Sequence, residues 1–400
     1  MEATRPRSSR KPENNDVRCR FEPRITPPQP FETGPDRRRR ATIDLVTPMS
    51  RMLEETRQQP EALAKTLEEG LATLGDLRRQ FEARRPRLVT LVARGTSDNA
   101  AQFGRYLIEI TTRIPVSLAA PSILTLYQCP LDLRDVLVVG ISQSGESTDT
   151  NAVLEDARAR GALTVGITNE SESAMARTAE FVIAARAGRE ESVAATKTYS
   201  CQLMALYLLA AALGGEVQVE ALRRLPDWVQ TVLELEERAG EIAERYTFMT
   251  RAVAVGRGLN YANALELGLK LMETSYVVTE RFSSADLMHG PIALIERSFP
   301  VFAFAPPGVT WPSISAMLDR LEELKAETLV ITDESNPEAA AKPARLIQLP
   351  IYSIAPQGPC DLYTPIPYIV PAQLFAAHLA AIKGLNPDRP RALQKVTRTV

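Results

Sequence analysis

The residues best suited to bind a ligand form the loop ISQSGEST, residues 141–148, which follows the apolar run DVLVVG. Its hydroxyl groups come from Ser142, Ser144 and Ser147, and Gln143 adds an amide. A strand-to-helix loop also presents free backbone N–H groups and the positive end of the helix dipole. The loop can therefore donate many hydrogen bonds to a phosphate. A serine-rich turn that only caps its own helix is the alternative interpretation.

A second turn with hydroxyl groups, Gly95–Ser97, ends the strand pattern RLVTLVA. Ligands of open parallel sheets bind beyond the carboxyl ends of the strands, so Thr96 and Ser97 are expected at the same sheet edge as the first loop. No Walker lysine follows the first loop, and the GxGxxG pattern is absent. The two turns together predict a site for a small monophosphate rather than for a nucleotide.

Three charged residues, Glu266, Lys270 and Glu273, lie four and three positions apart in NALELGLKLMETS. This spacing puts them on one face of a helix. They form either a solvated ion pair with Glu273 beside it or, because the helix starts just after GRG, a part of the site. The chain has two histidines. His289, in DLMHGPIAL, is a candidate acid/base near neutral pH or a structural residue, and His378 is interpreted as packing.

Strand patterns alternate with amphipathic helices, which predicts an α/β fold with a doubly wound parallel sheet flanked by helices. The pattern then repeats: VARG returns as VGRG, VGISQSG as FAFAPPG, and ITNES as ITDES. We expect two tandem domains of this kind, one at 49–225 with N-terminal helices and one at 248–400 with a C-terminal tail. A helical connector is expected at 226–247.

The repeats differ at the hydroxyl-rich loop. The second copy reads Ala305, Pro306, Pro307, Gly308, Val309, Thr310. It has lost nearly all the hydroxyls and two backbone donors, because proline has no N–H. Only the first copy can therefore line a polar site here.

Composition excludes several classes. The 400 residues carry a formal net charge of -2, which suggests neither a nucleic-acid nor a membrane partner, and no apolar run is long enough for a transmembrane helix. The four cysteines are scattered and form no CxxC pair, so we expect no disulfide framework, no zinc site and a reducing cytoplasm. We expect no metal and no cofactor. Residues 1–48 are rich in Arg and Pro and are predicted to be a disordered extension, with Met49 as a possible true start.

Six motifs resemble one family. RGTSDNA, ISQSGESTDT and SVAATKTY resemble the SIS fold of phosphosugar enzymes and regulators. ALELGLKLMETSY, SADLMHGPIALIE and the ending GLNPDRPRALQKVTRTV resemble the isomerase half of glutamine–fructose-6-phosphate aminotransferase. The resemblance covers about residues 49–400 and implies two SIS domains.

The resemblance also implies roles for individual residues. Ser97, Ser142, Gln143, Ser144 and Ser147 would bind the phosphate and sugar of a hexose 6-phosphate. Ala195 replaces a serine of the aminotransferase pattern, which leaves a backbone contact from Val193 or Ala194.

For the chemistry, the resemblance implies that Glu273 carries the proton between C1 and C2 of the open-chain sugar, with Lys270 orienting the sugar or holding the Glu273 charge. His289 would open the sugar ring from the neighbouring subunit, which implies a homodimer. Lys395 would contact the open-chain sugar.

The implied reaction depends on the domains present. We expect no glutaminase domain, because the sequence opens at Met1-Glu2. RAGREESVAATK, FSSADLMHGP and NPDRPRALQKVTRT resemble the second type of glucosamine-6-phosphate deaminase. The leading hypothesis is thus deamination of glucosamine 6-phosphate to fructose 6-phosphate and ammonia. The alternatives are an enzyme for another amino-sugar phosphate, a deglycase, and a non-catalytic phosphosugar-binding regulator.

Overall fold

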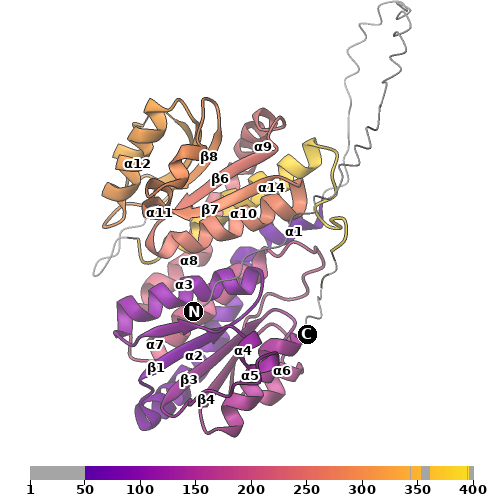
Figure 1. The fold of residues 1–400 in the computed structure, drawn as a ribbon, viewed down its shortest axis with the longest axis vertical. Coiled ribbons are helices and arrows are strands. Elements are labelled where there is room, and N and C mark those ends of the chain that lie inside the picture. Colours follow the sequence, from indigo (N-terminus) through magenta and orange to yellow (C-terminus); the bar gives the residue numbers. More distant parts are fainter. Residues whose placement is uncertain (1–49, 343, 353–360, 394, 396–400) are drawn as a thin grey trace, which may run out of the picture. The chain divides into compact units, whose positions relative to one another are not determined.

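The computed structural model describes residues 50–342, 344–352, 361–393 and 395. The extension predicted for residues 1–48, and Met49, lie outside the described residues. The first half of the described chain begins with helices α1 and α2, which precede the first sheet (Figure 1). Its helices are α1 (Arg51–Arg57), α2 (Gln59–Arg84), α3 (Thr96–Thr112), α4 (Ser122–Thr125), α5 (Thr148–Ala159), α6 (Ala174–Thr178) and α7 (Lys197–Ala212).

The first sheet has five parallel strands in the order β2-β1-β3-β4-β5. They are β1 (Leu88–Val92), β2 (Val116–Leu118), β3 (Val136–Ser142), β4 (Leu163–Thr168) and β5 (Phe181–Ala184). The order reverses direction between β1 and β3, so the loops after these two strands leave the sheet side by side. Both predicted ligand loops follow these strands, which is where open parallel sheets bind ligands.

The second sheet repeats this plan in the order β10-β9-β8-β6-β7, again with parallel pairing. Its strands are β6 (Arg251–Gly256), β7 (Val278–Ser283), β8 (Pro300–Phe304), β9 (Glu327–Asp333) and β10 (Arg345–Leu349). Read from β7, the order matches that of the first sheet read from β2, which confirms the predicted repeat of an α/β fold. The helices of this half are α10 (Tyr261–Ser275), α11 (Ser284–Met288), α12 (Trp311–Glu323), α13 (Pro337–Ala340) and α14 (Pro365–Ile382).

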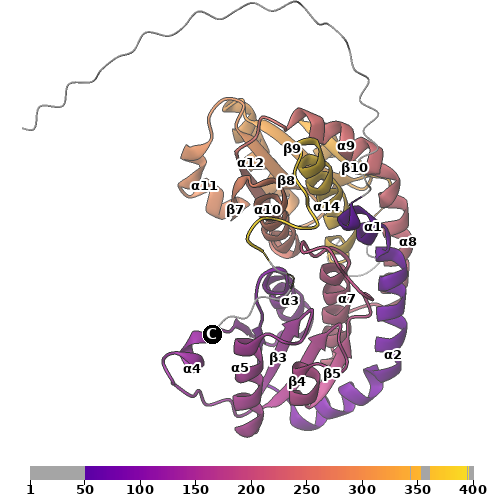
Figure 2. The same cartoon turned by 90° about the vertical axis from the view of Figure 1, so that its right-hand side faces the viewer.

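Two helices connect the halves. They are α8 (Val219–Val232) and α9 (Glu236–Arg245), with the short 3₁₀ turn η1 (Leu233–Leu235) between them. Helix α8 packs along α2, as Figure 2 shows, and α9 packs on α14. The connector predicted at 226–247 therefore begins inside a helix that is already packed on the first half.

One apolar core runs through both halves. In β3, Leu137, Val139 and Ile141 face this core, while Val138 faces a smaller cluster that α5 covers. The alternation follows from the two-residue period of a strand, and burial of both faces is usual for parallel sheets. Phe302 of β8 belongs to the same large core. The two sheets thus share one large apolar core, and each sheet also has a smaller separate cluster, which α5 covers in the first half and α12 in the second.

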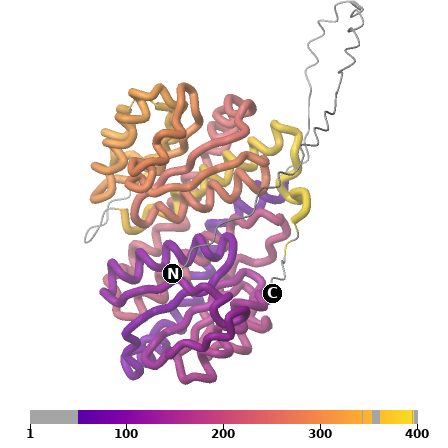
Figure 3. The backbone as a smooth tube through the Cα atoms, in the orientation of Figure 1, coloured from indigo at the N-terminus to yellow at the C-terminus, as the bar shows by residue number. Residues whose placement is uncertain are grey.

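Helix α14 is long and apolar enough to cross a membrane by length and composition, although we expected no such segment from the sequence. In the structure, 83% of this 18-residue window is buried inside the protein. The helix packs on α8, α9 and α10, and the tube in Figure 3 can be followed through it to the C-terminal segment. Its apolar composition is thus accounted for by its position in the core.

Candidate active site

A pocket of about 310 Å³ lies at the carboxyl edge of the first sheet. The loops after β1 and β3 contribute to it, and so do the 193–195 segment, α10 and the C-terminal segment. Its lining comprises Arg94, Gly95, Thr96, Ser97, Ser142, Gln143, Ser144, Ser147, Val193, Ala195, Glu273, Leu393 and Lys395. Most of the predicted site residues, from positions spread over 300 residues of chain, are therefore brought to one cavity.

The hydroxyl loop, defined here as residues 142–147, is shaped by its own side chains. The Ser142 Oγ accepts a hydrogen bond of 3.1 Å from the Gly145 N–H. Gly145 has a φ of 65°, and an added Cβ would collide with the Ser173 side chain, so this position requires glycine. The loop ends at Ser147, where α5 begins. Backbone N–H groups, hydroxyls and a helix N-terminus therefore meet at the pocket, as phosphate binding requires.

An ion pair that the sequence did not reveal lies beside this loop. The Arg94 Nε donates to Asp149 Oδ2 at 2.7 Å, and the Ser147 Oγ donates to Asp149 Oδ1 at 3.0 Å. The Asp149 side chain is buried, whereas that of Arg94 is 52% exposed and lines the pocket. Asp149 thus orients both a cation and a hydroxyl that line the pocket. Arg94 directly precedes the GTS turn, but nothing in the sequence indicated its pairing.

The turn after β1 depends on Gly95, which has a φ of 58°. Helix α3 begins at Thr96, so Thr96 and Ser97 occupy its first turn at the pocket. The Ser97 Oγ accepts a hydrogen bond of 2.9 Å from the buried Gln202 Nε2 of α7. Gln202 thereby orients Ser97. This role could not be predicted from the sequence, because Gln202 lies in the apolar helix α7.

The charged face of α10 is buried against α3. The Glu266 carboxylate accepts hydrogen bonds from the Asn99 Nδ2 at 2.7 Å and the Thr96 Oγ1 at 3.1 Å. The Lys270 Nζ lies 3.4 Å from Glu266 and 2.6 Å from the Glu273 carboxylate. Lys270 is 1% exposed, so the solvated ion pair considered from the sequence is wrong.

The electrostatics of this cluster favour a charged lysine. Burial by itself lowers the pKa of Lys270, but the charges of Glu266 and Glu273 outweigh burial and raise it. Burial raises the pKa of Glu266, against the effect of Lys270. Glu273 alone of the three lines the pocket, with 22% of its side chain exposed. The cluster therefore presents the Glu273 carboxylate to the pocket. The Lys270 ammonium contacts this carboxylate from the side away from the pocket.

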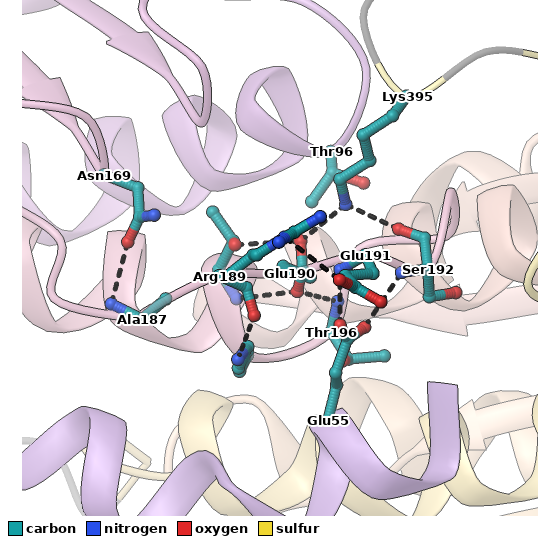
Figure 4. Close-up of polar contacts among 12 residues, drawn as sticks. Glu55, Thr96, Asn169, Ala187, Arg189, Glu190, Glu191, Ser192, Thr196 and Lys395 are labelled. Carbon is teal, nitrogen blue, oxygen red and sulfur yellow. Dashed lines mark hydrogen bonds and ion pairs between the residues drawn. The ribbon is translucent and has the colours of Figure 1, made fainter. Parts of the chain in front are cut away.

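Lys395 reaches the pocket from the C-terminal segment. Its Nζ donates to the Glu190 Oε2 at 2.9 Å and to the Ser192 carbonyl at 2.6 Å (Figure 4). The buried Glu190 also accepts hydrogen bonds from the backbone N–H groups of Thr196 and Thr198. Burial alone would raise the pKa of Glu190, but Lys395 and these N–H groups outweigh it and lower the pKa. Glu190 therefore holds Lys395 as a charged partner, and no sequence pattern distinguished it from Glu191.

Three predicted site residues do not line the pocket. Ala194 is fully buried, and its neighbour Ala195 lines the pocket instead. Lys270 lies behind Glu273. His289 is exposed at the end of α11, where its backbone N–H caps the helix by donating to Ala285 and Asp286. Within one chain, His289 is thus outside the cavity, because α11 is not among the elements that form it.

The remaining candidates fit packing roles. His378 of α14 is partly buried, contacts α9, and has its pKa lowered by burial. Within the described residues no group of three or more His, Cys, Asp or Glu side chains could hold a metal. In the same part of the chain, Cys129 and Cys201 are free thiols, and Cys19 and Cys360 lie outside it.

Comparison with known proteins agrees with this architecture. The SIS domain family model matches residues 84–212 and 249–383, one match on each sheet. The glutamine–fructose-6-phosphate aminotransferase of Pyrococcus horikoshii is 38% identical over 355 residues, which cover 86% of this chain and 57% of that protein. The chain thus spans little more than half the length of the curated relatives it matches.

Two solved structures show the same arrangement. The C-terminal domain of the aminotransferase from Francisella tularensis has a TM-score of 0.77 and 28% identity, and the match covers 86% of this chain and 98% of that one. The glucosamine-6-phosphate deaminase of Thermotoga maritima has a TM-score of 0.68 at 23% identity, with 88% and 100% covered, and shows the fold alone. The chain belongs to the SIS domain family and carries two SIS domains in tandem, like the isomerase half of the aminotransferases.

Proposed function

We propose that this protein is an enzyme that deaminates glucosamine 6-phosphate to fructose 6-phosphate and ammonia. The observation that carries the proposal is the single pocket in which the hydroxyl loop, Glu273 and Lys395 meet. A phosphate-binding site alone would suit a regulator that senses a phosphosugar. A carboxylate and an ammonium group beside that site are the groups that an aldose–ketose conversion needs.

The hydroxyl loop and the turn at Thr96 and Ser97 suit the phosphate. They offer hydroxyls and N–H groups at two helix N-termini, and Arg94 adds a guanidinium that can form charge-assisted hydrogen bonds. With the phosphate held there, the sugar carbons would extend toward Glu273 and Lys395. The pocket volume of about 310 Å³ lies at the lower end of the range for small-molecule sites and suits a hexose phosphate.

In the proposed reaction Glu273 takes the proton from C2 of the open-chain amino sugar and returns it to C1. The electron pair of the C2–H bond forms a C1–C2 double bond, while the π pair of the C1 carbonyl moves to O1, which takes up a proton. The nitrogen lone pair then forms a C=N bond at C2 as the C1–C2 π pair takes the proton at C1. The nitrogen loses one proton, so the net result is a C1 hydroxyl and a ketimine at C2. Water adds to this C=N bond, and its collapse releases ammonia and the ketone. Lys270 would hold the Glu273 carboxylate in position for the first step, since its ammonium donates to that carboxylate at 2.6 Å.

Lys395 would hold the open-chain carbonyl end of the substrate. Its ammonium donates to Glu190 and Ser192, which leaves one N–H for a sugar oxygen. The ion pair with Glu190 fixes the position of a long, otherwise flexible side chain next to the cavity.

We further propose a homodimer in which His289 of a second copy opens the sugar ring. His289 is exposed here and outside the pocket of its own chain, so a role in ring opening requires that another chain approach the cavity. A second copy is the proposed source of that approach.

The names of the relatives favour amino-sugar phosphates as substrates, since they are aminotransferases that act on fructose 6-phosphate. The same pocket would also serve simple isomerisation between an aldose phosphate and a ketose phosphate, which is the second candidate.

The test is to incubate the purified protein with glucosamine 6-phosphate, galactosamine 6-phosphate, a fructosamine 6-phosphate and glucose 6-phosphate. Ammonia and ketose release are measured separately. We expect ammonia and fructose 6-phosphate in equal amounts from glucosamine 6-phosphate. Ketose from glucose 6-phosphate without ammonia from any amino sugar would replace deamination by isomerisation. Binding without turnover of any substrate would favour a regulator.

A further inference from the structure

Three segments far apart in sequence meet beside Lys395. They are α1, the segment 189–196, and the C-terminal segment that begins after α14. The Asp388 carboxylate accepts hydrogen bonds from the backbone N–H groups of Arg51 and Met52 at 3.0 and 2.8 Å. The Asp388 carbonyl accepts one from the Val193 N–H at 3.2 Å. The C-terminal segment is thereby fixed to both other segments seven residues before Lys395.

The central contact of this junction is Glu55 of α1, which is 5% exposed. Its two carboxylate oxygens accept hydrogen bonds from the backbone N–H groups of Glu191 and Ser192, as Figure 4 shows. Lys395 donates to two acceptors, the Glu190 carboxylate and the Ser192 carbonyl. Along the chain, the two N–H groups that donate to Glu55 lie between the residue that supplies the first acceptor and the carbonyl that is the second. Glu55 therefore contacts the backbone that carries both partners of Lys395 without touching Lys395 or the pocket.

We propose that Glu55 is a positioning residue for Lys395, whose ionised carboxylate holds residues 190–192 in the conformation that receives the Lys395 ammonium. The inference rests on the proposed role of Lys395 in the reaction. An ionised carboxylate offers an oxygen to each of the two N–H groups. A protonated carboxyl has one hydroxyl that donates, so one of the two N–H groups loses its acceptor and the segment is held more weakly.

The surroundings of Glu55 place this change near neutral pH. Burial, followed by the negative charge of Glu190, raises the pKa of Glu55 to about 7. The Ser192 N–H, Lys395 and Lys197 act in the opposite direction. On its outer side Glu55 borders a separate pocket, from which protons can reach it, lined also by the charged residues Arg51, Glu54, Arg189 and Glu191. Activity that depends on this contact should therefore rise as the pH increases through about 7.

The first test compares pH profiles of kcat/KM between pH 5.5 and 8.5 for the natural chain, Glu55→Gln, Glu55→Asp and Glu54→Gln. Glutamine has one oxygen acceptor, so it should behave like permanently protonated Glu55. We expect the kcat/KM of Glu55→Gln to show no rise near pH 7 and to remain at the value that the natural chain has at low pH. Glu55→Asp keeps a carboxylate, so its kcat/KM should regain part of the rise.

Glu54→Gln is the matched control, because Glu54 is exposed on the same helix and borders the same outer pocket. It should retain the natural profile. An unchanged rise in Glu55→Gln would overturn the proposal, since the rise would then belong to another group.

A second measurement does not depend on turnover, so it separates failure of this inference from failure of the proposed function. Hydrogen exchange of the Glu191 and Ser192 amides, corrected for intrinsic rates, reports the contact directly. We expect their protection to grow with pH through about 7 in the natural chain and to stay low in Glu55→Gln. Equal protection in both chains would refute the contact. Loss of protection with unchanged kcat/KM would refute its effect on Lys395.

Stability provides a third readout with the opposite sign from activity. The pKa of Glu55 is higher in the fold, at about 7, than its ordinary value of 4.5. A raised carboxyl pKa means that its contribution to stability is present below 4.5 and is lost as pH rises through 7. Glu55→Gln should therefore lose less stability than the natural chain between pH 5 and 8, measured by thermal unfolding. Equal losses of stability in both chains would show that Glu55 does not titrate in this range and would contradict the proposed pH dependence.

Discussion

The two SIS domains contain the same loop in two forms. In the first domain the hydroxyl loop, residues 142–147, follows β3 and opens onto the pocket. In the second, the equivalent residues 305–310, called here the proline loop, follow β8. This loop forms hydrogen bonds with side chains of its own domain. The Asn336 Nδ2 donates to the Ala305 carbonyl at 3.1 Å, and the Thr310 Oγ1 donates to Asp361 at 3.3 Å.

The backbone of the two copies is nevertheless alike. Gly95 and Gly258, which lie in the turns after β1 and β6, have φ values of 58° and 59°. A Cβ added at Gly95 would meet no atom within 4 Å, whereas one at Gly258 would lie 3.0 Å from the Thr310 Cγ2. The turn after β1 thus faces open space, and the turn after β6 faces Thr310. Side chains, not chain topology, thus distinguish the copy whose loop lines the pocket from its repeat.

The second domain contributes through a helix instead. Helices α3 and α10 follow equivalent strands, pack against each other, and exchange the hydrogen bonds of Thr96 and Asn99 with Glu266. The proposed division of labour is that α3 presents its N-terminus to the phosphate, while α10 presents Glu273 from its C-terminal half. In this proposal, two copies of one fold supply both the phosphate-binding turn and the carboxylate that transfers the proton.

The largest expected effect tests this division. Glu273→Gln keeps the shape of the side chain but removes the proton acceptor. We expect kcat to fall by about 10² to 10⁴-fold with the affinity for substrate nearly unchanged. Ammonia release gives kcat, and calorimetric titration with fructose 6-phosphate gives affinity. Glu280→Gln, an exposed carboxylate on β7, is the control. Turnover that survives in Glu273→Gln would show that another group moves the proton.

The next prediction compares equivalent hydroxyls. Ser147→Ala removes a pocket hydroxyl that Asp149 orients, so KM should rise by about tenfold, the effect of one charge-assisted hydrogen bond. Thr310→Val, at the equivalent position, should leave KM unchanged. It should lower the free energy of unfolding by about 1 kcal/mol, because buried Asp361 loses a donor. Initial rates and urea unfolding measure the two quantities. A raised KM in Thr310→Val would mean that the proline loop also binds ligand.

The smallest effects concern the two glycines. Gly95→Ala and Gly258→Ala each force a positive φ on alanine, which should cost about 1 kcal/mol. Gly258→Ala should cost more, because the new methyl group also presses on Thr310. Only Gly95→Ala should raise KM, since Gly95 borders the pocket. Chemical unfolding and initial rates decide between these outcomes. Equal KM in both variants would contradict the assignment of the ligand-binding turns to the first domain alone.

Much of this fold could be predicted because its signals are local. Strand runs such as VLVVGIS are almost entirely apolar, as buried parallel strands are. The segments between them have apolar residues at the helical spacing. The repeated motifs then fixed the number of sheets. The hydroxyl residues were recognisable for the same reason, because Ser142, Ser144 and Ser147 directly follow a strand end.

The parts of the site that escaped prediction depend on distant partners. Glu190 was indistinguishable from Glu191 until Lys395 was placed 2.9 Å from it. Arg94 and Asp149 are 55 positions apart, and Gln202 lies 105 positions from Ser97. Spacing within a motif carries no information about such contacts, because the sheet order brings these segments together.

By itself the sequence determined the two parallel α/β domains, the loss of hydroxyls in the second copy, and the helix face that carries Glu266, Lys270 and Glu273. Only the tertiary structure decided that Glu266 and Lys270 are buried while Glu273 reaches the cavity, and that His289 lies outside it. The physical reason is that burial and charge are set by neighbouring elements. The i,i+4 spacing of Glu266 and Lys270 would look the same on a solvated helix, but packing of α10 on α3 removes the water and makes each charge depend on its partners.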